Sequence, residues 1–171
     1  MRIRPETHAD IDAIRRLNDV AFDGPLEGHI VDGLRAAARP FISLVAEDDG
    51  EIVGHICFSP VEVERPDGTR TTILGLAPMA VMPERQKQGI GSKLIEHGLN
   101  ACRATGTKAV VVLGHPDYYP RFGFVPAAPR GLRSEYDVPD PVFMLLEFES
   151  GVADDLHGLA RYHQAFSDAT S

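Results

Sequence analysis

The chain has 171 residues, of which 43% are hydrophobic and 25% are charged, and its formal net charge at pH 7 is −8. This size and composition predict one globular domain over residues 1–171, with a core over 1–150 and a tail over 151–171 that packs back and frays at its end. The acidic balance argues against nucleic-acid binding, because that function relies on lysine and arginine contacts to phosphates.

The N-terminal part of the sequence predicts a short strand followed by two helices. Residues 2–4 read as the strand, and Thr7 is a good helix N-cap with Asp10 as its capping-box partner. Apolar residues then repeat at helical spacing over 11–21, and a second helix is expected over 26–37.

Three further strands are predicted before the middle of the chain. Residues 41–46 and 52–58 are rich in β-formers, and the Asp-Asp-Gly run at 48–50 between them indicates a hairpin. A second turn at 66–68 leads into a strand over 71–81. Strands joined in this way form an antiparallel meander.

The second half of the chain starts with a helix over about 89–105, which Gly106 ends. The continuous apolar run at 109–113 is typical of a strand covered on both faces. A strand–helix–strand connection makes its two strands parallel, so we expect the fourth and fifth strands to pair in parallel. An irregular, proline-rich connection follows, and the last strand is expected over 142–148.

The turn between the fourth strand and the following helix carries a Q-x-x-G-x-G pattern, formed by Gln86, Gly89 and Gly91. Glycine lets the backbone approach a ligand closely, and the free N–H groups of a helix N-terminus bind anions. The pattern therefore predicts a pyrophosphate site. It is neither of two familiar phosphate motifs, because no P-loop run occurs and Leu94 stands where the dinucleotide fingerprint needs a third glycine.

Pro78 lies inside the otherwise apolar fourth strand. A proline removes one donor from the ladder, so it belongs at an edge or a bulge. A bulged strand that diverges from its neighbour would leave the main-chain groups of Met79 to Val81 free for an extended ligand that carries amides. A pyrophosphate beside such an arm describes coenzyme A.

The whole run over 76–94 resembles motif A of the GNAT superfamily of acetyl-CoA-dependent N-acetyltransferases, and Tyr-Pro-Arg-Phe-Gly-Phe at 119–124 resembles its motif B. The chain is also similar to an uncharacterised bacterial branch of predicted acetyltransferases. The segments that carry this second similarity are Ser43–Ala46, Val53–Ile56, Phe58–Pro60 and Val112–Gly114, with Gly158, Tyr162 and Phe166 as a closing pattern.

The resemblance implies a GNAT-like α/β (α+β) fold with a mixed, mostly antiparallel central sheet of about seven strands and helices on both faces. The parallel fourth and fifth strands would splay at the cofactor site, and acetyl-CoA would be the cofactor. Arg85, Lys87 and Lys93 surround the loop and could meet its phosphates or stand on a solvated helix face. The expected cofactor-binding residues are Met79, Ala80, Val81, Gln86, Lys87, Gln88, Gly89, Ile90, Gly91, Ser92 and Phe122.

Tyr119 matches the family tyrosine that donates a proton to the sulfur of coenzyme A. A phenol suits this role because it is neutral at pH 7 and can donate a hydrogen bond. The adjacent Tyr118 must then point elsewhere in a regular backbone. The alternative is that Tyr119 only packs over the thiol.

The general base is less well defined, because residues 73–82 contain no acid although many GNAT enzymes place a glutamate on this strand. Glu27, at the start of the second helix, matches a glutamate of the similar branch and could face the acceptor. An acid there also stabilises a helix N-terminus without any catalytic role. His115, after the fifth strand, is the other titratable candidate, or a loop residue that makes hydrogen bonds.

We expect an enzyme that transfers the acetyl group to a primary amine of a small molecule or a protein by direct attack in a ternary complex, and we consider a homodimer. A non-catalytic acyl-CoA-binding or sensing module is the alternative. No apolar run approaches the roughly 20 residues of a membrane span, and the N-terminus starts a strand rather than a signal peptide. Cys57 and Cys102 lack metal-ligand spacing. We therefore expect a cytoplasmic protein with reduced thiols, no metal and no membrane partner.

Overall fold

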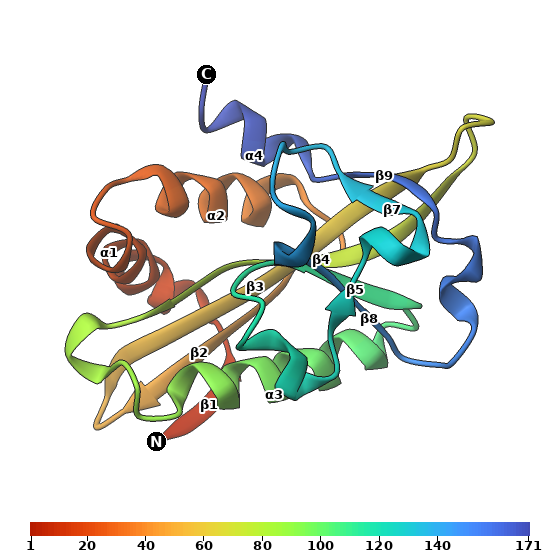
Figure 1. Ribbon diagram of the computed structural model, residues 1–171. Coiled ribbons are helices and arrows are strands. Elements are labelled where there is room, and N and C mark those ends of the chain that lie inside the picture. Colours follow the sequence, from red (N-terminus) through yellow and green to blue (C-terminus); the bar gives the residue numbers. More distant parts are fainter.

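The computed structural model describes residues 1–171, apart from the side chains of residues 152 and 153. The described residues form a nine-stranded sheet, in which β1, β2, β3, β4, β5, β8 and β6 follow one another and β9 pairs with β3 and β7 (Figure 1). The strands are β1 Arg2–Pro5, β2 Ile42–Asp48, β3 Glu51–Glu64, β4 Arg70–Val81, β5 Ala109–Leu113, β6 Val125–Pro126, β7 Leu132–Ser134, β8 Phe143–Glu147 and β9 Gly158–Arg161.

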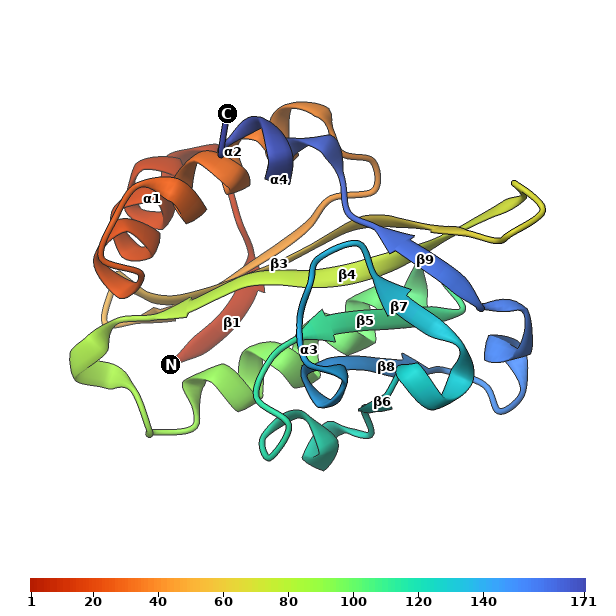
Figure 2. The same ribbon diagram turned by 45° about the horizontal axis from the view of Figure 1, so that its top comes forward.

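Helices cover both faces of this sheet, as predicted. Figure 2 shows α1, α2 and α4 on one side and α3 on the other. The helices are α1 Ile11–Ala21, α2 Leu26–Ala37, α3 Ile90–Ala104 and α4 Gln164–Asp168. Each face of the sheet buries a core, because alternate side chains of a strand point to opposite faces. Thus Ile56 and Phe58 pack on the α3 side, and Cys57 packs against α1 and α2.

The helix cap and the hairpin turn that the sequence predicted are both confirmed. Thr7 and Asp10 form the predicted capping box, in which the Thr7 main-chain N–H donates to the Asp10 carboxylate at 2.7 Å. The hairpin between β2 and β3 turns at Asp49 and Gly50, both with positive φ (50° and 80°). Two positive φ values are what a two-residue hairpin needs to match the strand twist.

The sheet has more strands than the approximately seven that were expected, because three short ones form late in the chain. β6 and β7 lie in the segment expected to be an irregular connection, and β9 lies in the tail. The tail packs back as predicted, since β9 pairs with β3 from Glu62 to Glu64. Strands of two to four residues show no usable alternation, so only their distant partners reveal them.

The sequence also predicted that no segment spans a membrane and that the two cysteines are reduced thiols. Within the described part of the chain, every helix is too short or too polar to cross a membrane. Cys57 and Cys102 are both buried and free, and burial raises the pKa of each thiol. Such thiols are poor nucleophiles and act here as small core residues.

Candidate cofactor and acceptor site

The central feature of the site is the parting of β4 from β5. The two strands pair in parallel at Leu74, Gly75 and Leu76, and their register ends where Leu76 faces Val112. β4 nevertheless continues to Val81, and Figure 2 shows it running away from β5 toward the start of α3. This parting is the one predicted from Pro78, and it leaves one edge of β4 open over its last residues.

Pro78 lies at a bulge, as its position in an apolar strand predicted. The register between β3 and β4 shifts between Ile56 and Phe58, so that Ala77 and Pro78 together stand opposite Cys57. The Cys57 thiol donates to the Ala77 carbonyl oxygen at 3.2 Å. A bulge inserts an extra residue and turns the strand, so it redirects β4 at the point where β5 stops following it.

The open edge of β4 presents the main-chain groups of Met79 and Val81. The Met82 N–H donates to the Val53 carbonyl at 2.9 Å, and hydrogen-bonded pairs alternate along an antiparallel ladder. The N–H and C=O of Ala80 therefore point to β3, whereas those of Met79 and Val81 point into the gap. Of the three predicted β4 residues, Ala80 is thus the one with its main chain turned away from the gap.

The loop after β4 has a backbone shape that could hold an anion, and the anion site itself stays a prediction. Gly89 is the N-cap of α3 with φ 85° and ψ 3°, a left-handed conformation that only glycine adopts without a cost. The Gln86 side chain folds back to donate to the Val81 carbonyl at 3.2 Å. A hollow of about 480 Å³ lies over this loop, and it is lined by Val81, Arg85, Gln86, Lys87, Gly89, Ile90, Gly91, Ser92, Tyr118 and Arg121.

The basic side chains near the hollow differ from the expected set. Arg85 is held by the Asp48 carboxylate at 2.8 Å, so its charge is already partnered. Lys87 is exposed at the rim, and Lys93 is exposed beside it on α3. Arg121, which the sequence did not single out, lies 4.6 Å over the ring of Tyr118 and lines the hollow. Its only sequence signal is its place inside motif B.

Tyr118 and Tyr119 point in different directions, as predicted. The Tyr118 hydroxyl is 2.9 Å from the Ser92 hydroxyl in the first turn of α3, so Tyr118 belongs to the cofactor loop. Tyr119 is 8% exposed and lies in the core on the α3 side together with Leu76 and Val112. Burial raises the pKa of Tyr119 to about 12. Phe122 is half-buried, with its ring centre 5.4 Å from that of Tyr118.

The two candidate bases occupy different surroundings. His115 is exposed, and its ring Nδ1 accepts from the Asp117 N–H at 3.4 Å, which is the arrangement of a loop residue. Glu27 is half-buried in the first turn of α2. Among the described residues Glu27 has no hydrogen bond or ion pair, so its carboxylate is available to a ligand. β4 itself carries no acid from Arg70 to Val81.

Comparisons with known proteins agree with this geometry. Residues 2–127 match the family described as an acetyltransferase (GNAT) domain. The chain is 34% identical to the uncharacterized N-acetyltransferase YhbS of Escherichia coli (strain K12) over 168 residues, which is 98% of this chain and 99% of that protein.

Two solved structures resemble the fold closely. The crystal structure of YhbS from Escherichia coli in complex with CoA superposes with a TM-score of 0.88 at 33% identity, over 97% of this chain and 91% of that one. A GNAT family acetyltransferase from Brucella melitensis in complex with acetyl-CoA has a TM-score of 0.79 at 39% identity, over 96% and 97% of the two chains.

Proposed function

The chain belongs to the GNAT family of acetyl-CoA-dependent N-acetyltransferases, and on that premise we propose that it transfers the acetyl group of acetyl-CoA directly to a primary amine in a ternary complex. The amine belongs to a small molecule or to a protein. The observation that carries this proposal is the parting of β4 and β5 above a glycine-rich helix N-terminus, because it offers an extended slot that ends in an anion site.

Coenzyme A would occupy this slot along its whole length. The pyrophosphate would bind the free N–H groups around Gly89, Ile90 and Gly91, where the helix dipole favours negative charge. The pantetheine amides would pair with the Val81 N–H and the Met79 carbonyl, because the Val81 carbonyl already accepts from the Gln86 side chain. Lys87 and Arg121 line the same hollow and would add positive charge near the phosphates.

Acetyl transfer then requires a polarised carbonyl and a protonated leaving group. The Met79 N–H points into the gap near the end where β4 and β5 meet, and there it would donate to the thioester oxygen as negative charge develops. Tyr119 would give its hydroxyl proton to the departing sulfur. Its raised pKa, about 12, keeps the hydroxyl protonated at neutral pH, which a general acid needs.

Tyr119→Phe is expected to lower kcat by up to about 100-fold, the lower limit of typical general-acid contributions, because a coenzyme A thiolate is already a fair leaving group. The affinity for acetyl-CoA should stay close to that of the wild type. Tyr118→Phe is the matched control, since its hydroxyl lies on Ser92 at the cofactor loop. It should change the KM for acetyl-CoA rather than kcat. Equal, small effects on kcat would leave Tyr119 as a packing residue.

The activity itself is tested by mixing the protein with acetyl-CoA and a panel of amines and following thiol release. Amine-dependent release with a matching gain in amine mass is the expected result. Tight binding of acetyl-CoA without release, across small amines and lysine-containing peptides, would instead identify a binding or sensing module.

Glu27 is the residue we propose to face the acceptor on the α1–α2 side, because its carboxylate is half-buried and lacks a partner among the described residues. Glu27→Gln keeps the size of the side chain and removes its charge. We expect a higher KM for the amine, an unchanged KM for acetyl-CoA and a slightly lower melting temperature, because the helix N-terminus loses a favourable negative charge. His115→Ala, at an exposed loop position, is the comparison variant.

A further inference from the structure

Two buried hydroxyl groups on the sheet face opposite α3 lack hydrogen-bond partners among the described residues. They belong to Ser59 on β3, which is 1% exposed, and to Tyr162 directly after β9, which is 9% exposed. Buried polar groups are almost always hydrogen-bonded, because an unpaired one loses its contact with water without a replacement. The two hydroxyls therefore mark a place where another polar group is expected to bind.

Both hydroxyls lie beside Gly75. Ser59 is the residue directly opposite Gly75 in the register of β3 and β4, so the two share a face of the sheet. A Cβ atom placed on Gly75 would lie 3.2 Å from Cε1 of Tyr162, a ring atom next to the carbon that carries the hydroxyl. The missing side chain at Gly75 thus lets the Tyr162 ring reach the strand, and it brings the two hydroxyls to the same level of the sheet.

This level is where the slot for coenzyme A closes. Gly75 precedes Leu76, the last β4 residue that pairs with β5. An arm that runs from the loop back along Val81 and Met79 would bring its thioester end to this point. Tyr119 lies on the α3 side of the same point, so the hydroxyls of Ser59 and Tyr162 approach from the opposite face.

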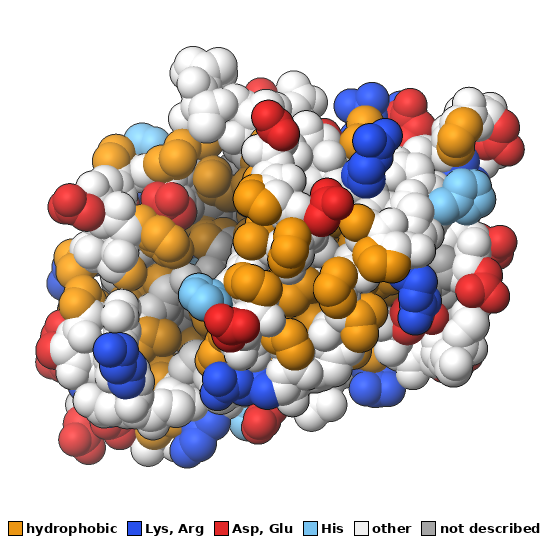
Figure 3. All heavy atoms as spheres, viewed as in Figure 1, with side chains coloured by type: hydrophobic (Ala, Val, Ile, Leu, Met, Phe, Trp, Pro, Cys, Tyr) orange, Lys and Arg blue, Asp and Glu red, His pale blue; other side chains and the backbone are white. Residues whose placement is uncertain are grey.

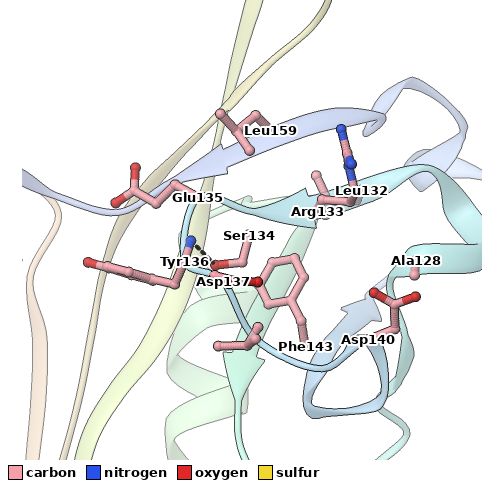
Figure 4. Close-up of a pocket in the computed structure, with 11 residues that line it drawn as sticks. Ala128, Leu132, Arg133, Ser134, Glu135, Tyr136, Asp137, Asp140, Phe143 and Leu159 are labelled. Atoms are coloured by element: carbon pink, nitrogen blue, oxygen red, sulfur yellow. Dashed lines mark hydrogen bonds between the residues drawn. The ribbon is translucent and has the colours of Figure 1, made fainter.

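The surroundings of Tyr162 suit an amine that arrives from solvent. Its ring centre is 5.5 Å from that of Tyr136, a residue that is 39% exposed. Tyr136 and Glu135 line a cavity of about 360 Å³, which Figure 4 shows. Figure 3 shows the surface hollowed on this face, between α2 and the segment that carries β7.

We propose that Ser59 and Tyr162 bind the attacking nitrogen of the acceptor, and that this nitrogen is a primary amine in its neutral form. The inference rests on the proposed function. Each hydroxyl oxygen accepts one of the two N–H hydrogens, which leaves the nitrogen lone pair free to point at the thioester carbon. A secondary amine has one N–H and keeps only one of these bonds, so the site favours primary amines.

The acetyl transfer forms one bond and breaks one. The nitrogen lone pair forms the C–N bond, and the C–S bond breaks with its electron pair going to sulfur. The nitrogen loses one proton to water, and the sulfur takes one from Tyr119, which water then reprotonates.

Ser59→Ala and Tyr162→Phe each delete one oxygen and keep the rest of the side chain. With propylamine as the acceptor, each should lower kcat/KM for the amine by about 10-fold, the equivalent of one hydrogen bond. The KM for acetyl-CoA should not change, and the preference for propylamine over N-methylpropylamine should shrink. The melting temperature should stay the same or rise, because neither hydroxyl is bonded in the free protein.

Ser43→Ala is the matched control. It also removes a buried serine hydroxyl from a neighbouring strand, but that hydroxyl is 2.8 Å from Nε2 of His55. It should lower the melting temperature and leave kcat/KM for propylamine unchanged. If Ser59→Ala and Tyr162→Phe behave like this control instead, their hydroxyls hold a structural water and the proposal is wrong.

Failure of the proposed function would be visible separately, as a wild-type protein that acetylates no amine. Crystals of the coenzyme A complex soaked in propylamine would then decide the present inference by themselves. A nitrogen within hydrogen-bond distance of both hydroxyls supports it, and water alone between them overturns it.

Discussion

Replacement of Gly91 by glutamate is expected to weaken coenzyme A binding by about 100-fold, because a carboxylate in the first turn of α3 would repel the pyrophosphate. The backbone should tolerate the change. A Cβ atom on Gly91 would lie 3.5 Å from the Tyr118 hydroxyl and 3.6 Å from Cε of Met79, which are ordinary contacts. An acid near a helix N-terminus also stabilises the helix, so the melting temperature should stay the same or rise.

Calorimetric titration with coenzyme A measures this loss, and Gly91→Gln is its matched control. Glutamine has nearly the same shape as glutamate, so the difference between the two variants isolates the charge. Gly89→Val is a poorer test, because φ at Gly89 is 85° and a β-branched residue would strain the loop. Unchanged affinity in Gly91→Glu would mean that the pyrophosphate binds elsewhere.

Acidification is expected to lower the free energy of unfolding by about 1.4 kcal/mol per pH unit between about pH 6 and 4, because of His55. This residue is 0% exposed, and burial, with a smaller contribution from the charge of Arg35, lowers its pKa from 6.5 to about 3. The Asn18 amide nitrogen lies 3.4 Å from Nδ1 of His55 and can only donate, so Nδ1 accepts this hydrogen bond. The Nε2–H of His55 then donates to the Ser43 hydroxyl. The folded protein therefore holds His55 neutral.

The sign follows from the two pKa values. Below its ordinary pKa the histidine of the unfolded chain takes up a proton, whereas the folded one stays neutral down to about pH 3. The unfolded state thus binds more protons in this window, and stability falls as the pH falls. Above about pH 6.5 the contribution is complete and constant.

Urea unfolding at a series of pH values measures this slope. His55→Gln keeps an amide donor and removes the titration, so its slope between pH 6 and 5 should be clearly smaller than that of the wild type. Titration of the Asp10 carboxylate does not contribute to the slope of the unfolding free energy between pH 6 and 5. Arg4 holds the pKa of Asp10 below its usual range, so its contribution is lost only at lower pH. Equal slopes in the two proteins would show that His55 does not control the acid sensitivity.

The start of the first helix and the turn of the cofactor loop could be predicted from the sequence, because their signals are local. Thr7 and Asp10 mark a helix start within four residues, and Gly89 stands where the chain must turn with a positive φ. Pro78 indicated the bulge for the same reason, since the missing N–H is a property of that residue alone. The family resemblance added Tyr119 and Glu27, whose roles stay predictions.

Other parts of the site depend on residues that are far apart in the chain. Nothing near Arg121 indicates that it lies over Tyr118 at the rim of the hollow, and β7 and β9 are too short to show a period. His55 likewise looks like a surface residue in an apolar strand, and only its burial against Asn18 and Ser43 gives it a perturbed pKa.

The sequence by itself thus determined the loop and the bulge where we propose that coenzyme A binds, because turns, caps and glycines act on their immediate neighbours. Only the tertiary structure decided which residues lie on the side where we propose that the acceptor binds. Gly75 and Tyr162 are brought together by the pairing of β9 with β3, and Ser59 joins them through the register of β3 with β4. Contacts of this kind form when distant strands bury their apolar faces together, so no single stretch of the sequence carries a signal for them.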